Sequence, residues 1–265
     1  MSATLAAMAV DDPKSPAEPS PLALLRRRRP SERLGVSVVQ GIVELIVSGE
    51  FVPGGTLPPE SEIADHFGVS RTVVRESLKR LEEKGLVRAR QGMRTTINPV
   101  TKWEVHDATV LEAMIRHDDT LGILDELSSA RAALESAMAA QAAVKVAGGA
   151  DTKELRASLQ TMQAMVRQPA RFRGADVAFH GAVIALSGNR LSGSIARVLI
   201  EEAIDSSRYR GNDPGGHFDQ TLREHEAIAE AVLRGDPSAA KEAMDSHIRD
   251  SWARRRLPVA GEAEV

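Results

Sequence analysis

Apolar residues recur every three or four positions along most of this chain, which is the spacing that gathers side chains on one face of an α-helix. In the N-terminal part this pattern predicts helices over 34–47, 58–67 and 70–84. Two short strands over 86–97 follow them. The pattern therefore predicts a small domain made of three helices and a hairpin.

The second and third of these helices carry clear start and end signals. Pro58-Pro59 suits the first turn of a helix, and Gly68 can adopt the left-handed conformation that ends it. Ser70 can cap the next helix through its hydroxyl, and Gly85 ends that helix. Two short helices joined by a tight turn and followed by a basic hairpin form a winged helix–turn–helix.

The rest of the chain shows only helical periodicity. The expected helices are 121–145, 152–166, 175–186, 191–209, 221–233 and 239–253, with loops at 169–174 and 211–216. The number becomes seven if the stretch 191–217 breaks in two. The fold class is therefore mainly α, with an N-terminal winged helix–turn–helix that has a small β wing, and a C-terminal antiparallel all-α bundle of six or seven helices.

These patterns also divide the chain into regions. We expect a disordered tail (1–30), a winged helix–turn–helix domain (31–100), a linker (101–120), a helical effector domain (121–257) and a loose tail (258–265). Within the first tail, Arg26-Arg27-Arg28-Arg29 is either a basic arm that follows the DNA backbone or a solvated run of charge.

Composition and charge narrow the functional classes. The chain has no cysteine, which excludes disulfides, thiol catalysis and cysteine-ligated metals and fits a reducing cytoplasm. Aromatic residues make up only 3%, too few for a base-stacking surface, and no apolar run is long enough to span a membrane. Residues 26–102 hold 14 Lys and Arg against 9 Asp and Glu, a net charge of +5, so the remainder of a chain of net −3 carries −8. One half alone is thus suited to DNA.

The third helix places basic and hydroxyl side chains near its N-terminus. Arg71 and Arg75 lie one turn apart on the same face, where each guanidinium can pair with guanine O6 and N7. Ser70 and Thr72 suit phosphate contacts beside them, and Arg94 lies in the wing. The alternative is a solvated charged face, but cap, turn, basic face and wing together favour binding to double-stranded DNA.

Four metal-ligating residue types fall on the inward faces of three predicted helices. Asp176 and His180 are four residues apart, and His225 and His247 each lie on an apolar stripe. A lone histidine at such a position is more often an ordinary core residue. Four such groups favour a divalent metal, because one ion satisfies them all, and three imidazoles with one carboxylate suit zinc, with nickel or manganese as alternatives.

Arg131 interrupts the apolar stripe of the helix over 121–145. A buried arginine must be paired or must face a cavity. Glu135, one turn later, is the candidate partner for an internal ion pair. In the alternative, Arg131 binds the carboxylate of an effector, to which its forked geometry is suited.

The N-terminal motif resembles the winged helix–turn–helix of the GntR family of bacterial transcriptional regulators. The resemblance lies in LPPESEIADHFGVSRTVVRESLKRLEEKGLV, preceded by IVSGEFVPG. It implies that Arg71, Thr72 and Arg75 contact DNA and that the wing enters the minor groove. The wing departs from the usual Gly-x-Gly-Thr, because Arg94 replaces the second glycine.

The C-terminal region is similar to the FCD ligand domain of the FadR-type subfamily. The similarity is carried by D-x-x-F-H ending at His180, E-H at His225, and the final His247. It implies metal binding by the aspartate and three histidines. In the linker, Trp103, Asp107 and Val110-Leu111 resemble the sugar-acid-responsive branch, of which a galactonate regulator is an example.

The resemblance and the residues together predict a metabolite-responsive transcriptional regulator. We expect a homodimer on a palindromic operator, and a repressor that is released by a small organic acid, such as a hexonate, bound at the metal and Arg131. One alternative is a metal-dependent hydrolase with a DNA-binding head, for which Glu224 is the candidate base, although its position next to His225 predicts that it points away. The other is a metal-free regulator of an apolar effector.

Overall fold

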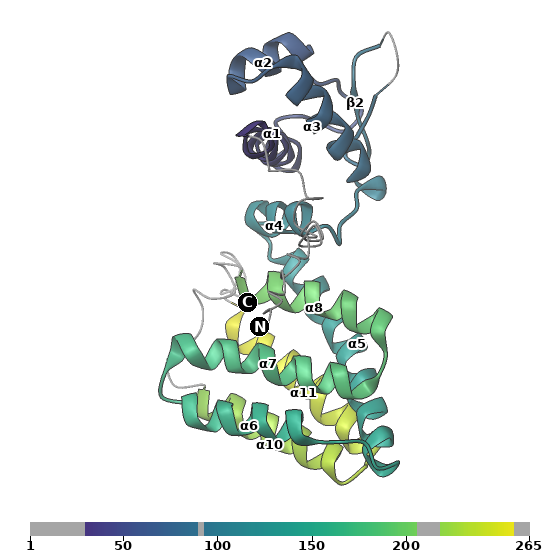
Figure 1. Ribbon diagram of the computed structural model, residues 1–265, viewed down its shortest axis with the longest axis vertical. Coiled ribbons are helices and arrows are strands. Elements are labelled where there is room, and N and C mark those ends of the chain that lie inside the picture. Colours follow the sequence, from purple (N-terminus) through teal and green to yellow (C-terminus); the bar gives the residue numbers. More distant parts are fainter. Residues whose placement is uncertain (1–29, 90–92, 206–217, 257–265) are drawn as a thin grey trace, which may run out of the picture.

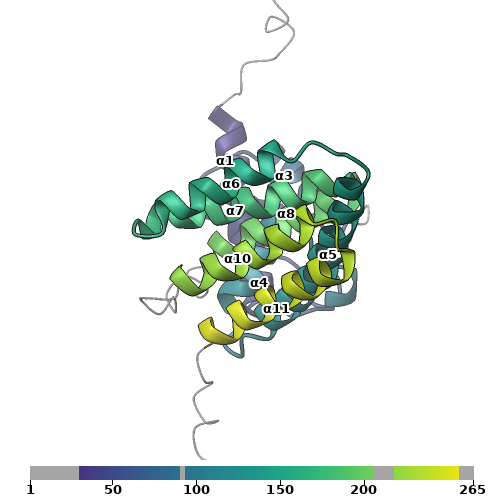
Figure 2. The same ribbon diagram turned by 90° about the horizontal axis from the view of Figure 1, so that it is seen from below.

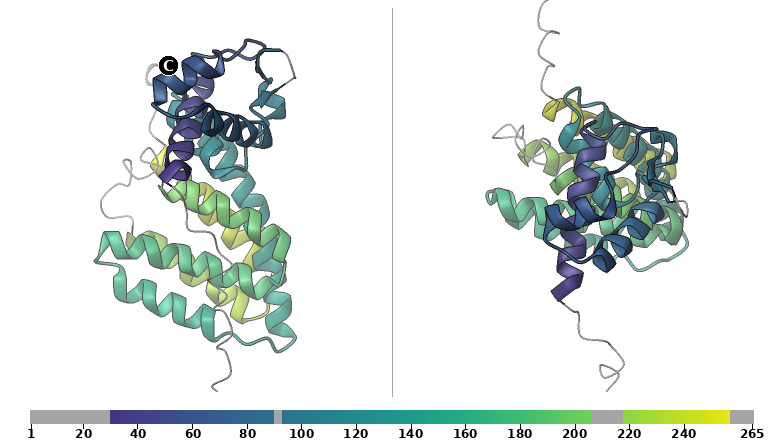
Figure 3. Two further views of the ribbon diagram at one scale, coloured as in Figure 1. Left: turned by 45° about the horizontal axis from the view of Figure 1, so that its top comes forward. Right: turned by 90° about the horizontal axis from the view of Figure 1, so that it is seen from above.

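The structure is a computed structural model that describes residues 30–89, 93–205 and 218–256. The two predicted tails, the run Arg26–Arg29, the tip of the wing and the loop over 211–216 lie outside the described residues. The described chain forms two bodies joined end to end by one helix (Figures 1 and 3). We call 30–97 the head and 122–256 the body.

The head contains three helices and one small sheet. Its elements are α1 (Pro30–Val47), α2 (Glu60–Phe67), α3 (Arg71–Glu83), β1 (Val87–Arg88) and β2 (Thr96–Ile97). The two strands are antiparallel, with Val87 opposite Ile97. The predicted winged helix–turn–helix is confirmed (Figure 1).

The predicted caps orient the helices of the head. Ser70 accepts a hydrogen bond from the Val73 amide, and Gly68 ends α2 in the left-handed conformation with φ +62°. The core beneath them gathers apolar side chains from every element of the head, namely Val38, Ile42, Ile46, Leu57, Ile63, Val74, Leu81, Leu86 and Ile97. This core holds α3 so that its opposite face is exposed.

The helix α4 (Ala108–His117) connects head and body, and it is buried on two faces. Val110 and Ala113 join the core of the head, whereas Leu111 and Ile115 join a separate cluster with residues of the body. Asp107 caps α4, and its other carboxylate oxygen lies 2.5 Å from Lys84, the residue that ends α3. The linker is therefore a structured joint, with the short helix η2 (Val100–Lys102) before it.

The turn between α4 and the body is tight. Leu121 takes the left-handed conformation with φ +62°, which is rare for a residue other than glycine. Asp118 supports the turn, since its Oδ2 accepts a hydrogen bond from the Ile123 amide at 2.6 Å. The side chain of Leu121 packs against the cluster that contains Leu111 and Ile115.

The body is a helical bundle whose helices lie side by side (Figure 2). The part of the body that the structure describes holds six helices, namely α5 (Gly122–Ala147), α6 (Lys153–Met165), α7 (Pro169–Ser187), α8 (Arg190–Asp205), α10 (Phe218–Leu233) and α11 (Pro237–Arg255). The long α5 packs against α7, α8, α10 and α11. The predicted all-α bundle is confirmed, and none of the described helices has the length and apolarity needed to cross a bilayer.

The predicted loop over 169–174 is wrong, because α7 begins at Pro169. Proline is tolerated in the first turn of a helix, where its missing N–H needs no partner. Phe172, Ala175 and Phe179 then continue one buried stripe at helical spacing. Burial of this stripe outweighs the cost of Gly174 inside the helix.

Replacement of Gly85 tests the joint between α3 and the linker. Gly85 has φ +70°, and an added Cβ would lie 2.0 Å from the carbonyl oxygen of Lys102. Gly54 is a matched control, because its φ is +84° but no atom lies within 4 Å of an added Cβ. We expect Gly54→Ala to lower the free energy of unfolding by about 1–2 kcal/mol from backbone strain alone, and Gly85→Ala to lower it by more. Urea denaturation measures both, and equal losses would contradict the close approach.

Candidate metal centre and DNA-binding face

The four predicted metal ligands converge inside the body. Asp176 and His180 come from α7, His225 from α10 and His247 from α11, and one ligand atom from each lies within 4.8 Å of all the others. Asp176 Oδ1 is 3.0 Å from His225 Nε2, which is 3.3 Å from His180 Nε2. The three histidines are buried and Asp176 is partly buried.

Each imidazole is held from its outer side through Nδ1. His180 Nδ1 lies 2.5 Å from Glu135 Oε2, and His247 Nδ1 lies 2.9 Å from Glu224 Oε2. His225 Nδ1 donates to the carbonyl oxygen of Thr221 at 2.7 Å. Such outer partners fix the tautomer that carries its proton on Nδ1 and leave Nε2 as the ligand atom.

This arrangement requires positive charge at its centre. With its proton on Nδ1, neutral His225 presents the lone pair of Nε2 to Asp176 Oδ1. That oxygen is buried and receives no hydrogen bond from any described residue. Two facing lone pairs 3.0 Å apart are stabilised by a proton or by a cation that both can ligate. The donor set therefore fits a divalent cation, and three imidazoles with one carboxylate suit zinc, nickel or manganese.

The charges of the cluster also favour metal binding. When the positive charge is a proton on the imidazoles, burial raises the pKa of Asp176, but protonated His225, His180 and His247 lower it by more, so its pKa lies well below the usual range. Burial and the nearby His225 lower the pKa of His247 to about 3. An ionised carboxylate and a neutral imidazole are the protonation states that a metal requires.

The two outer carboxylates are each paired with an arginine. Glu135 Oε1 lies 2.8 Å from Arg131 Nε, and both side chains are buried. Burial raises the pKa of Glu135, but Arg131 and His180 lower it to about 2. The internal ion pair, which was one of the two interpretations of Arg131, is thus present, and it connects Arg131 to the ligand His180.

Glu224 does not point away from the metal centre as predicted. Its carboxylate holds His247 and also forms a forked pair with Arg254, at 2.8 Å and 2.9 Å. Burial raises the pKa of Glu224, but the bonds from His247 and Arg254 lower it to about 2. The prediction failed because it considered one helix, whereas Glu224 reaches across from α10 to α11. Arg254 and Thr221 were not predicted at all.

The predicted DNA-contacting residues are all exposed on the head. Ser70, Arg71, Thr72 and Arg75 lie at the start of α3, and all four are exposed. Glu60 at the start of α2 accepts from Arg75 Nε at 2.8 Å. Arg94 is exposed in the wing, next to the tip that lies outside the described residues.

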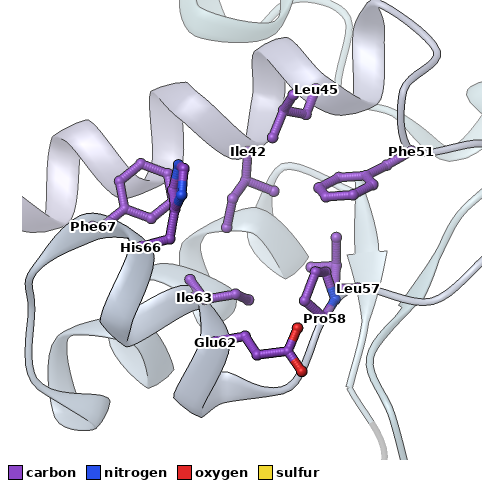
Figure 4. Close-up of a pocket in the computed structure, with 9 residues that line it drawn as sticks. All are labelled: Ile42, Leu45, Phe51, Leu57, Pro58, Glu62, Ile63, His66 and Phe67. Carbon is purple, nitrogen blue, oxygen red and sulfur yellow. The ribbon is translucent and has the colours of Figure 1, made fainter.

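An apolar cavity of about 300 Å³ lies in the head between α1 and α2 (Figure 4). Its lining consists of Ile42, Leu45, Phe51, Leu57, Pro58, Glu62, Ile63, His66 and Phe67. Glu62 and His66 are the polar side chains in this lining. A cavity of this character does not suit an anionic effector.

Comparison with known proteins assigns both parts of the chain. Residues 34–97 match "Bacterial regulatory proteins, gntR family", and residues 126–250 match "FCD domain". The Uxu operon transcriptional regulator of Escherichia coli is 32% identical over 84% of this chain and 85% of its own. The chain belongs to the GntR family. The predicted DNA-binding transcriptional regulator with an FCD domain is thereby confirmed.

Other GntR relatives agree with this assignment. An HTH-type transcriptional regulator of Mycobacterium tuberculosis is 33% identical over 86% of this chain and 90% of its own. The galactonate operon transcriptional repressor of E. coli is 29% identical over 79% of this chain and 91% of its own. The solved structure of Lar, which controls expression of the Listeria monocytogenes agr system, covers 87% of this chain and 98% of its own with a TM-score of 0.56, and at 19% identity it shows the fold alone.

Zinc addition tests the metal centre. We expect the purified GntR protein to bind one zinc ion per chain and to gain about 2.7 kcal/mol of stability when free zinc is 100 times its Kd. Asp176→Asn should greatly reduce this gain, and the pair His180→Ala with His225→Ala should abolish it. Calorimetric titration and thermal unfolding with zinc or with a chelator measure the effect.

Asp245→Asn is the matched control for the metal prediction, since Asp245 is a carboxylate on α11 whose partner is Arg249 rather than a histidine. Its zinc response should equal that of the unaltered protein. Equal zinc responses in Asp176→Asn and Asp245→Asn would remove Asp176 from the ligand set.

Proposed function

We propose that this GntR protein is a metal-dependent, metabolite-responsive repressor. The proposal rests on one observation, the convergence of Asp176, His180, His225 and His247 in a body that α4 joins to a DNA-binding head. Zinc is the proposed ion, with nickel and manganese as alternatives. Four protein ligands close a tetrahedral site, whereas on a six-coordinate ion they leave two positions open; we propose the six-coordinate geometry, in which an effector can bind.

The proposed effector is a small organic acid. A carboxylate is a hard oxygen ligand that suits an open position on such an ion, and relatives of this chain are regulators of the galactonate and uxu operons. We therefore propose a sugar acid. Arg131 pairs with Glu135, which in turn holds the proposed ligand His180, so Arg131 supports the metal centre. Its direct contact with an effector carboxylate stays a prediction.

The DNA-bound form is proposed to be a homodimer on a palindromic operator in the cytoplasm. Two copies of α3 would then occupy half-sites about one DNA turn apart. Arg71 and Arg75 are proposed to read guanine, Ser70 and Thr72 to contact phosphate, and Arg94 to enter the minor groove. We also propose that the chain divides into its functional regions at residues 30, 100, 120 and 257, as the sequence predicts.

A purely regulatory role is favoured over hydrolysis by the state of Glu224. A general base is most effective when its pKa lies near the working pH. The pKa of Glu224 is lowered to about 2 by its bonds to His247 and Arg254, which outweigh burial. Its carboxylate oxygens are already used to hold those two side chains.

Substitution of the recognition arginines tests DNA reading. We expect Arg71→Ala and Arg75→Ala each to relax the base preference by about 1–3 kcal/mol at one position of the half-site. Sequence preference is measured by selection from a random DNA library, followed by binding at several salt concentrations. Arg80→Ala is the matched control, because Arg80 is an exposed arginine near the other end of α3. A preference identical in all four proteins would exclude Arg71 and Arg75 from base contact.

Ligand release tests the effector class. With zinc bound, galactonate should weaken binding to the selected DNA by a factor of about 5–150, which is the usual range of allosteric coupling. Galactose has a similar carbon chain without the carboxylate and should have no effect. Fluorescence anisotropy of labelled DNA measures both. If neither galactonate nor other hexonates change DNA affinity, the sugar-acid proposal is wrong.

A further inference from the structure

The last turn of α11 contacts two other helices of the body. Arg254 forms its forked pair with Glu224 of α10. Trp252, two residues earlier, is buried and donates from Nε1 to Asp125 Oδ1 of α5 at 2.6 Å. Arg256 Nε lies 3.0 Å from the same oxygen. The end of α11 is thus fixed to both α5 and α10.

This turn also contacts the joint between body and head. Trp252 belongs to the apolar cluster that contains Leu111 and Ile115 of α4. A change in the position of Trp252 therefore changes the surface on which α4 packs.

The other face of α4 reaches the DNA-binding elements. Its N-cap, Asp107, binds Lys84 at the end of α3, and His117 in its last turn lies 2.6 Å from Glu44 of α1. Both ends of α4 are therefore tied to the head. A displacement of α4 must move α1 and α3 or break these bonds.

Glu224 connects the turn to the metal centre. Its Oε2 lies 2.9 Å from His247 Nδ1, while both of its oxygens accept from Arg254. His247 and Arg254 lie on the same helix, and both form hydrogen bonds with the carboxylate of Glu224. A rotation of the His247 ring would therefore move Glu224 and, through Arg254, the last turn of α11.

We propose that the row of His247, Glu224 and Arg254, which we call the α11 relay, transmits occupancy of the metal centre to Trp252 and α4. The inference rests on the proposed metal-dependent function. The other outer row runs from His180 through Glu135 to Arg131, which is buried on α5. The α11 relay is the row whose arginine lies in the turn that carries Trp252.

The two tryptophans of the chain make a direct test available. Trp103 lies in the linker, so Trp103→Phe leaves Trp252 as the single tryptophan. In this background the emission of Trp252 is recorded while zinc chloride is added, and zinc binding is measured separately by calorimetry. The same titrations are made with Arg254→Met and with Arg249→Met, whose arginine is on α11 but pairs with exposed Asp245.

The expected result separates binding from transmission. Zinc should change Trp252 emission in the background protein and in Arg249→Met. In Arg254→Met zinc should still bind, with affinity lowered by no more than the roughly 10–100-fold that loss of an outer-shell partner costs, because the ligands are intact, but Trp252 emission should no longer respond. In parallel, the zinc-dependent change in affinity for the selected DNA should be lost in Arg254→Met.

Three results have distinct meanings. If zinc binds and changes Trp252 emission equally in Arg254→Met and in the background protein, the α11 relay is overturned and the metal centre is intact. The same holds if zinc binds to the background protein without any change in Trp252 emission. Failure of the background protein to bind zinc overturns the proposed function itself. If Arg254→Met does not fold, Arg254→Gln removes the charge and the fork but keeps a polar side chain, and an emission change equal to that of the background protein again overturns the relay.

Discussion

The body of this GntR protein depends on one electrostatic constraint, which is that three imidazole nitrogens and one carboxylate oxygen meet with their lone pairs facing inward. The outer bonds to Glu135, Thr221 and Glu224 hold the rings in this orientation. Their mutual repulsion requires a positive charge at the centre. The relative positions of α5, α7, α10 and α11 therefore all depend on whether a positive charge lies among these four ligand atoms.

The surrounding charges keep this centre stable inside an apolar bundle. Each of the two outer glutamates carries a negative charge that would be costly to bury alone, and each faces an arginine. Arg131 lies within α5, whereas Arg254 lies in the final turn of α11. The same chemical arrangement therefore has a supporting role on α5 and a connecting role on α11.

Helical spacing was sufficient to predict that the four candidate ligands lie on inward faces, but it did not predict their outer partners. Asp176 and His180 are four apart, and His225 and His247 interrupt apolar stripes, so each could be placed on an inner face from its own helix. Glu224 and Arg254 contact each other across two helices, and the spacing within a single helix carries no information about such an approach. The start of α7 was missed for another reason, because Pro169 and Gly174 resemble loop residues although Phe172 belongs to a buried stripe.

The left-handed backbone at Leu121 has a consequence for how this architecture tolerates change. A glycine there would adopt the same conformation without strain, but it would lack the side chain that packs beside α4. Leucine instead makes the corner between α4 and α5 depend on the apolar contacts around it. Loss of those contacts would remove what holds Leu121 at its positive φ, so the angle between α4 and α5 is coupled to the packing of this one side chain.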